Sequence, residues 1–343
     1  MFSCADLFVL GPFSLSLSIY PHDSIPDYDT AKPWPRPPKD PLRSMVYESP
    51  AAEWGPGKLL NLSWVATGRL DSLLPGILTR YSSTNFVLLG LLLAGLAGAP
   101  RWDEFDQGHA AFDALPMARR KLYADMRYAS HGPPSRWTDV HGYDRTSYDG
   151  RNASTRPGHT DVWRTAGVYG GWTASDVTAS VVDIARLGYD LFGRQGPRML
   201  SRSSVTTMIP TGSFYGFATF NLSRGWGPSR TSPFNTAYGH LGATYGYQSI
   251  VIYFPAADLS IAVASNIETD SQVQPSDVVC IAYNAILATL SNSTEPSCAF
   301  NHSGYYGGVC DCGNDYHCNP LTKTCERSPG KGHLSKSDCE ALC

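Results

Sequence analysis

The stretch Tyr238–Asn266 reads Y-G-H-L-G-A-T-Y-G-Y-Q-S-I-V-I-Y-F-P-A-A-D-L-S-I-A-V-A-S-N, and it decides the fold of this chain. Its segments Gln248–Phe254 and Leu259–Ala264 are rich in β-branched and aromatic residues. Between them, Pro255–Asp258 has the composition of a turn, so the sequence predicts a β-hairpin. Both arms are almost continuously apolar, which predicts that both of their faces are covered, as in the middle of a sheet.

A histidine stands where the chain enters this hairpin. His240 lies two residues before Gly242, so its ring nitrogens adjoin a length of backbone that a ligand can approach closely. A single histidine is commonly a structural hydrogen-bonding residue, and that interpretation stands beside a functional one.

Three segments, in this order, resemble motifs of the serine β-lactamase, DD-peptidase and esterase superfamily, in its class C-like branch. Tyr81–Gly90 resembles the Tyr-x-Asn motif at the start of a buried helix. Gly170–Ser175, followed by Val181–Arg186, resembles the segment that leads into a later helix. The G-H-L-G of Gly239–Gly242 resembles the Lys-Thr-Gly or His-x-Gly triplet that lines the catalytic cleft.

The resemblance covers roughly residues 25 to 290 and implies an α+β fold, also described as an α/β sandwich. In that fold an antiparallel sheet is flanked by helices and joined to a helical, loop-rich lobe. The implied activity is that of a serine hydrolase, which cleaves an amide, ester or β-lactam bond of a small-molecule, peptide or ester substrate through an acyl-enzyme. No cofactor and no metal ion are implied.

The resemblance also assigns roles to five residues. Tyr81 matches the catalytic, proton-shuttling phenol, and Ser83 replaces the substrate-binding carboxamide of the family motif. His240 stands where other members have a catalytic Lys, and would hold the substrate or relay a proton near neutral pH. Gly242 belongs to the substrate-binding triplet, and the backbone N–H of Ala243 matches half of the oxyanion hole.

A structural alternative exists for the second motif. Tyr81 would then only pack, while Ser83 or Thr84 caps a helix over Asn85–Leu96, because Ser and Thr are good N-caps. The two interpretations are compatible.

The nucleophile of the family is not found in these 343 residues. Ser24–Asp29 resembles the segment that follows the first catalytic helix, yet nothing before it spells Ser-x-x-Lys, the spacing that places both side chains on one helical face. The Ser-x-x-Lys at Ser328–Lys331 contains Pro329 and Gly330, which exclude a helical turn. We therefore expect this chain to be inactive as printed, either as a non-catalytic binding or scaffold member of the fold or as an incomplete copy of an enzyme.

Other regions have clear local signals. Apolar periodicity predicts helices over Val181–Phe192 and from Pro275 to Leu290, the second packing on the sheet. The proline-rich Pro21–Trp54 is predicted to be a surface excursion. The region Arg101–Thr165 is predicted to be the loop-rich part of the lobe.

Composition limits the partners. A net charge of −3 without a basic stripe disfavours nucleic acid. The apolar run Phe86–Leu96 is too short to cross a bilayer, so no membrane span is expected.

Cysteines and sequons indicate the compartment. Seven of the nine Cys lie from Cys298 onward, and N-x-S/T triplets occur at Asn61, Asn152, Asn221, Asn292 and Asn301. Together they favour a secreted, disulfide-bonded glycoprotein, although Met1–Leu17 is a poor signal peptide because it lacks a basic residue. Seven is odd, so one thiol pairs elsewhere, with Cys280 or Cys4 as candidates, or stays free.

The predicted domain organisation follows from these signals. Residues 1–20 are an unassigned N-terminal segment, residues 21–295 a β-lactamase-related domain, and residues 296–343 a small cysteine-rich, disulfide-stapled module. Tyr305, Tyr306 and Tyr316 of this module suit contact with carbohydrate.

Overall fold

The computed structural model describes residues 41–66, 83–146, 160–195, 199–210, 215–222, 236–268, 273–291, 298, 316–319 and 324–327. Two compact units are distinguished: the described residues up to 298 belong to the first, and residues 316–327 to the second. In this part of the chain, no helix combines the length and the apolarity that crossing a membrane needs.

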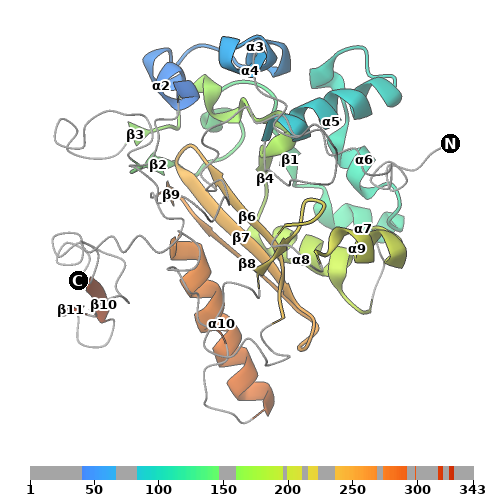
Figure 1. Cartoon of the computed structure of the whole chain (residues 1–343), viewed down its shortest axis with the longest axis vertical. Helices are drawn as coiled ribbons and strands as arrows, with labels where there is room; N and C mark the ends of the chain where they lie inside the picture. The colour runs from blue at the N-terminus through green and yellow to red at the C-terminus, as the bar shows by residue number, and fades with distance from the viewer. Residues whose placement is uncertain are drawn as a thin grey trace. The chain divides into compact units, whose positions relative to one another are not determined.

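The first unit is a mixed α/β structure around an antiparallel sheet of four strands (Figure 1). The strand order is β5-β6-β7-β8, with β5 over Phe220–Asn221, β6 over Tyr238–Thr244, β7 over Tyr247–Phe254 and β8 over Leu259–Ser265. The predicted hairpin is confirmed as β7 and β8. Tyr238–Thr244, however, forms a strand of its own rather than the entrance to β7.

The turn between β6 and β7 needs a glycine. Gly246 has φ +84°, and an added Cβ would lie 2.8 Å from the backbone carbon of Gly142. The left-handed conformation and the lack of space both exclude other residues at this position.

One helix covers each face of the sheet. On one face, α8 (Val181–Phe192) packs against β7 and β8, and an added Cβ on its Gly188 would meet Val251 and Ser260. On the other face lies α10, Val273–Ser291 (Figure 1). Its Tyr283 stacks on Phe254 with ring centroids 3.7 Å apart. Both predicted helices are confirmed; α8 has the predicted bounds, and α10 begins two residues before the predicted Pro275.

The helices α8 and α10 both pack against β8, but the predicted cover of this arm is incomplete. This strand is the edge of the sheet among the described strands, and its residues are half-buried or exposed. Its small residues Ala262 and Ala264 border a cavity whose lining also includes Ile184 and Leu187 of α8. An apolar run alone cannot distinguish a central strand from an edge strand of this kind.

The helical lobe is built mainly from short elements. The exception is α5 (Ser83–Leu96), which begins two residues before the predicted Asn85 and buries Val87, Gly90 and Ala94. The other helical elements are α3 (Pro56–Leu60), α4 (Ser63–Ala66), η1 (Trp102–Glu104), α6 (Gln107–Phe112), α7 (Met117–Arg120), η2 (Lys121–Tyr123), η3 (Pro134–Arg136), η5 (Ala166–Tyr169), η6 (Trp172–Ala174) and α9 (Arg202–Met208).

Two small sheets complete this unit. One pairs β1 (Arg127–Tyr128) with β4 (Val177–Thr178), and the other has the order β3-β2-β9, from Thr160–Asp161, Tyr143–Asp144 and Ile267–Glu268.

The prediction of a surface excursion over Pro21–Trp54 is wrong for its second half. Pro41–Glu48 forms helix α2, and Leu42, Val46 and Trp54 are buried in one cluster. The prolines that motivated the prediction lie mostly before residue 41, outside the described residues.

A buried polar cluster joins α2 to the sheets. The Arg43 guanidinium donates to Asp144 at 2.6 Å and to both carboxylate oxygens of Glu268 at 2.7 and 2.8 Å. The Tyr47 hydroxyl also donates to Asp144. Arg43, Asp144 and Glu268 are 3%, 4% and 0% exposed, so their charges depend on one another.

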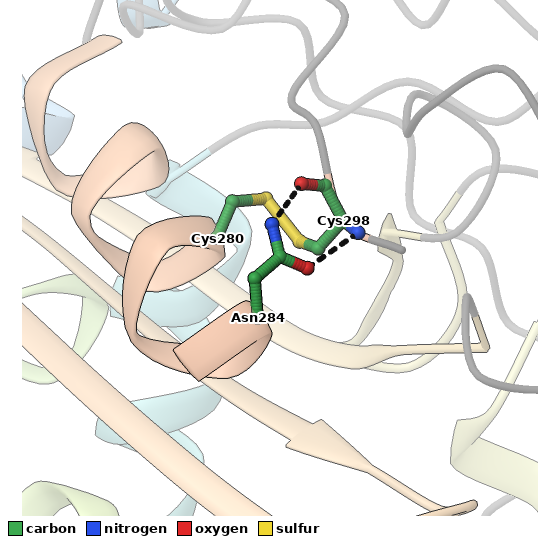
Figure 2. Close-up of a disulfide and its surroundings, with 3 residues drawn as sticks. All are labelled: Cys280, Asn284 and Cys298. Carbon is green, nitrogen blue, oxygen red and sulfur yellow. Dashed lines mark hydrogen bonds between the residues drawn. A yellow bond between two sulfur atoms is a disulfide. The ribbon is translucent and has the colours of Figure 1, made fainter. Parts of the chain in front are cut away.

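Figure 2 shows a disulfide on α10. Cys280 is bonded to Cys298, and Asn284 donates to the Cys298 carbonyl at 2.8 Å and accepts from its N–H at 2.9 Å. Cys280, one of the two candidates, is therefore the partner of a cysteine of the C-terminal cluster. Six cysteines remain from Cys310 to Cys343, an even number.

The second unit contains a two-stranded antiparallel ladder. Strand β10 (Tyr316–Asn319) pairs with β11 (Thr324–Arg327), and Cys318 stands opposite Cys325 in the register. The other cysteines of the predicted module, and the predicted domain boundaries at residues 20 and 295, lie outside the described residues, so the module remains a prediction.

The first testable prediction concerns Arg43. Arg43→Met removes the cation and leaves Asp144 and Glu268 buried, which should lower the free energy of unfolding by about 3–5 kcal/mol in urea titrations near neutral pH. The loss should shrink in acid, where the two carboxylates can take up protons. Arg127→Met, at an exposed position of β1, is the control and should change stability little. Equal effects of the two substitutions would show that the cluster is not important for stability.

Candidate active site

A cavity of about 860 Å³ lies against the sheet face that α8 only partly covers. Four of the five residues predicted for the site line it: Ser83, His240, Gly242 and Ala243. Tyr81 lies outside the described residues, so its predicted catalytic role stays a prediction.

The sheet wall of the cavity follows from strand register. His240 pairs with Val251 and Gly242 with Ser249, so these four residues share one face, together with Ala262 and Ala264 of β8. The opposite wall comes from α8 and from residues 169–179, and Ser83 contributes from the first turn of α5. Segments about 160 residues apart in the sequence thus meet at one site.

Packing of α5 against η6 positions Ser83. An added Cβ at Gly90 would lie 2.1 Å from the Thr173 hydroxyl oxygen, and that hydroxyl donates to the Phe86 carbonyl at 2.9 Å. Only a glycine permits so close an approach. Ser83 is the first residue of α5, and its side chain lies at the cavity. The packing of the helix accounts for this position whether or not Ser83 takes part in binding.

Both ring nitrogens of His240 are hydrogen-bonded. The Leu241 carbonyl, which can only accept, lies 2.5 Å from Nδ1, so Nδ1 carries the proton. Nε2 then accepts from the Tyr215 hydroxyl at 3.1 Å. Burial lowers the pKa of His240 to about 4, so the ring is uncharged at neutral pH. The predicted proton relay stays a prediction, and it would have to begin from this neutral form.

The register of β6 sets the direction of the Ala243 N–H, and its predicted oxyanion contact stays a prediction. The carbonyls of Ala237 and Leu241 point away from β7, since they accept from Leu222 N–H and from the His240 ring. Peptide groups alternate along a strand, so the Ala243 N–H points to the same side. Among the described residues, β5 pairs with Tyr238 and Gly239 on that side, and the edge of β6 near Ala243 borders the cavity.

The sequence did not indicate a strained acidic turn in the cavity wall. Trp172 is 2% exposed and has φ +48°, which is unusual for a large residue. The Asp176 carboxylate holds this turn by accepting from the Trp172 N–H and, at 2.7 Å, from the Ser175 hydroxyl. Burial raises the pKa of Asp176 to about 7. The pair Gly170–Gly171 was the available signal of an unusual turn.

Taken together, the sheet with a helix on each face and the cavity bordered by a His-x-Gly strand define a β-lactamase-like hydrolase architecture. The Beta-lactamase family model matches residues 46–278, well over half of the chain. The chain belongs to the beta-lactamase family.

Similar solved structures include a D-stereospecific amidohydrolase from Streptomyces sp., with 18% identity and a TM-score of 0.48 over 73% of this chain. They also include a D-amino acid amidase from Ochrobactrum anthropi SV3 in complex with L-phenylalanine amide, with 16% identity and a TM-score of 0.49 over 80% of this chain and 71% of that one. The chain spans 64% of the length of the amidohydrolase. No curated protein matches the chain.

The second prediction concerns Asp176. Because its pKa is about 7 in the fold and about 3.9 when unfolded, the folded state holds an extra proton between these values, and stability falls as the pH rises through them. Asp176→Asn keeps an acceptor for the Trp172 N–H and removes this titration. From about pH 5 to 8, the wild type should lose on the order of 3 kcal/mol relative to the variant in urea titrations.

Asp139→Asn, at an exposed position, is the control and should follow the wild-type pH profile. Parallel profiles for all three proteins would contradict the assignment.

Proposed function

We propose that this beta-lactamase-family hydrolase binds a small substrate with an amide, ester or β-lactam bond in the cavity described above. The observation that carries the proposal is the convergence of Ser83, His240, Gly242 and Ala243 on that cavity. Its volume of about 860 Å³ suits a small molecule or a short peptide end.

Each residue has a role that its geometry supports. The Ala243 N–H would donate to the reacting carbonyl oxygen, and Gly242 would let the substrate approach the strand. The neutral His240 would form the polar wall beside them, held in one orientation by Tyr215. Tyr81, if it reaches the cavity, would supply the phenol that moves a proton.

We further propose that the 343 residues as printed bind such substrates without forming an acyl-enzyme. A serine needs a nearby base to become a nucleophile. Pro329 and Gly330 exclude the helical turn that would bring the side chains of Ser328 and Lys331 together.

The third prediction tests this proposal with covalent probes. The folded chain is incubated with a fluorophosphonate and with a penicillin, and intact-protein mass spectrometry should detect no adduct, while an active serine hydrolase treated in parallel should be labelled. A stoichiometric adduct on any serine would refute it and identify the nucleophile.

The alternative function is that of a non-catalytic scaffold member of the family. It predicts no adduct either, but it also predicts that small amides and esters do not bind. Binding measurements on the folded chain therefore separate it from the first proposal.

The same chain is proposed to be a secreted, disulfide-bonded glycoprotein whose C-terminal module contacts carbohydrate. The Cys280–Cys298 bond supports an oxidising compartment, where such bonds persist. Asn61 of the sequon Asn61–Ser63 is exposed at the end of α3, whereas Asn221 is half-buried in β5.

The fourth prediction follows from this placement. Expressed through a eukaryotic secretory pathway, the chain should carry a glycan at Asn61 and none at Asn221, as peptide mapping with and without a glycosidase would show. An unmodified Asn61 in secreted protein would contradict the prediction.

Replacing both Cys280 and Cys298 by Ser should lower the free energy of unfolding by roughly 3 kcal/mol, since the bond closes a loop with a sequence separation of 18.

A further inference from the structure

Most hydroxyl groups that line the cavity are already used within the protein. Five of them donate to the protein: Thr173 to the Phe86 carbonyl at 2.9 Å, Ser175 to Asp176 at 2.7 Å, Thr244 to the Val168 carbonyl at 3.4 Å, Tyr247 to the Val140 carbonyl at 2.8 Å and Ser265 to the Ile267 carbonyl at 3.1 Å. These hydroxyls stabilise the wall, and their single O–H donors are no longer available to a substrate.

The Ser249 hydroxyl differs. It is exposed on β7, directly opposite Gly242, and among the described residues it has no hydrogen-bond partner. An added Cβ on Gly242 would lie 2.3 Å from the Ser249 Oγ, so this oxygen extends over the glycine of the His-x-Gly triplet. A substrate held against Gly242 would therefore contact it.

The surroundings of Ser249 are apolar or uncharged. Val251 and Ala264 lie beside it on the same sheet face, and Ile184 and Leu187 of α8 line the adjoining wall. Of the titratable groups of the described lining, His240 is neutral at pH 7 and Asp176 can only be neutral or negative. The described lining includes no Lys or Arg, so a carboxylate placed here would lose hydration without gaining an ion pair.

We propose that Ser249 is a specificity-determining residue, whose hydroxyl binds the amide or ester group of an uncharged substrate while the apolar part of that substrate lies against Val251 and α8. This inference rests on the proposed function, in which the cavity binds a small amide or ester. It adds the charge class of the substrate and the residue that selects it.

The test uses two ligands of nearly equal shape. N-acetylphenylalaninamide is neutral, whereas N-acetylphenylalanine carries a carboxylate at about pH 8. Dissociation constants of both, in D and L forms, are measured on the full chain by isothermal titration calorimetry. The amide should bind at least about tenfold more tightly than the acid, the equivalent of one ionic penalty of roughly 1.4 kcal/mol.

Variants then test the residue. Ser249→Ala should weaken binding of the amide by about three- to tenfold, the value of one net hydrogen bond, and should leave binding of the acid nearly unchanged. Ser249→Thr keeps the hydroxyl and should retain the wild-type preference. Ser135→Ala, at an exposed position of η3 outside the cavity, is the matched control and should have no effect.

The outcomes are distinguishable. If the folded wild type binds neither ligand, the proposed function and this inference both fail. If it binds the amide and the acid equally well, or if Ser249→Ala leaves amide binding unchanged, only the inference about Ser249 and charge is overturned.

Discussion

The pairing of Arg43 with Asp144 and Glu268 is the interaction on which the first unit depends. The three side chains come from α2, β2 and β9, and the pairs are separated by 101 and 225 residues in the sequence. Burial opposes ionisation of Asp144, but the Arg43 charge and hydrogen bonds from Tyr47 and Thr146 keep its pKa below the usual value. Buried charges of this kind allow one arrangement only, because a displaced partner leaves the others unpaired.

This cluster also shapes the site. Glu268 accepts the Gly246 N–H at 2.9 Å and so fixes the turn between β6 and β7. The Tyr247 hydroxyl, just after that turn, donates to the Val140 carbonyl at 2.8 Å, and both residues line the cavity. A second ion pair acts in the same way on α8, where Asp190 accepts two bonds from Arg119 at 2.6 and 2.7 Å. Stable ion pairs at two places therefore hold the walls of a cavity that is itself mostly apolar.

Family membership and the chemistry of the cavity explain different features of this chain. Membership of the beta-lactamase family accounts for the sheet, the covering helices and the His-x-Gly strand. The neutral His240, the acidic turn at Trp172–Asp176 and the exposed Ser249 are features of this chain. We propose that substrate selection depends on these features, because charge and hydrogen-bond capacity vary more readily than a packed fold.

The sequence by itself determined the hairpin of β7 and β8 and the bounds of α8, and it indicated four residues that line the cavity, because these signals are local: alternating or periodic apolar residues, a turn and a short motif. It did not determine that Arg43 is buried in a helix, that β8 is an edge strand, or that Cys280 is the partner of Cys298. Only the tertiary structure decided these points, since burial, edge position and disulfide pairing depend on contacts between distant segments. For the same reason Ser249 carried no signal in the sequence: its significance comes from Gly242 across the strand pair and from the cavity above both.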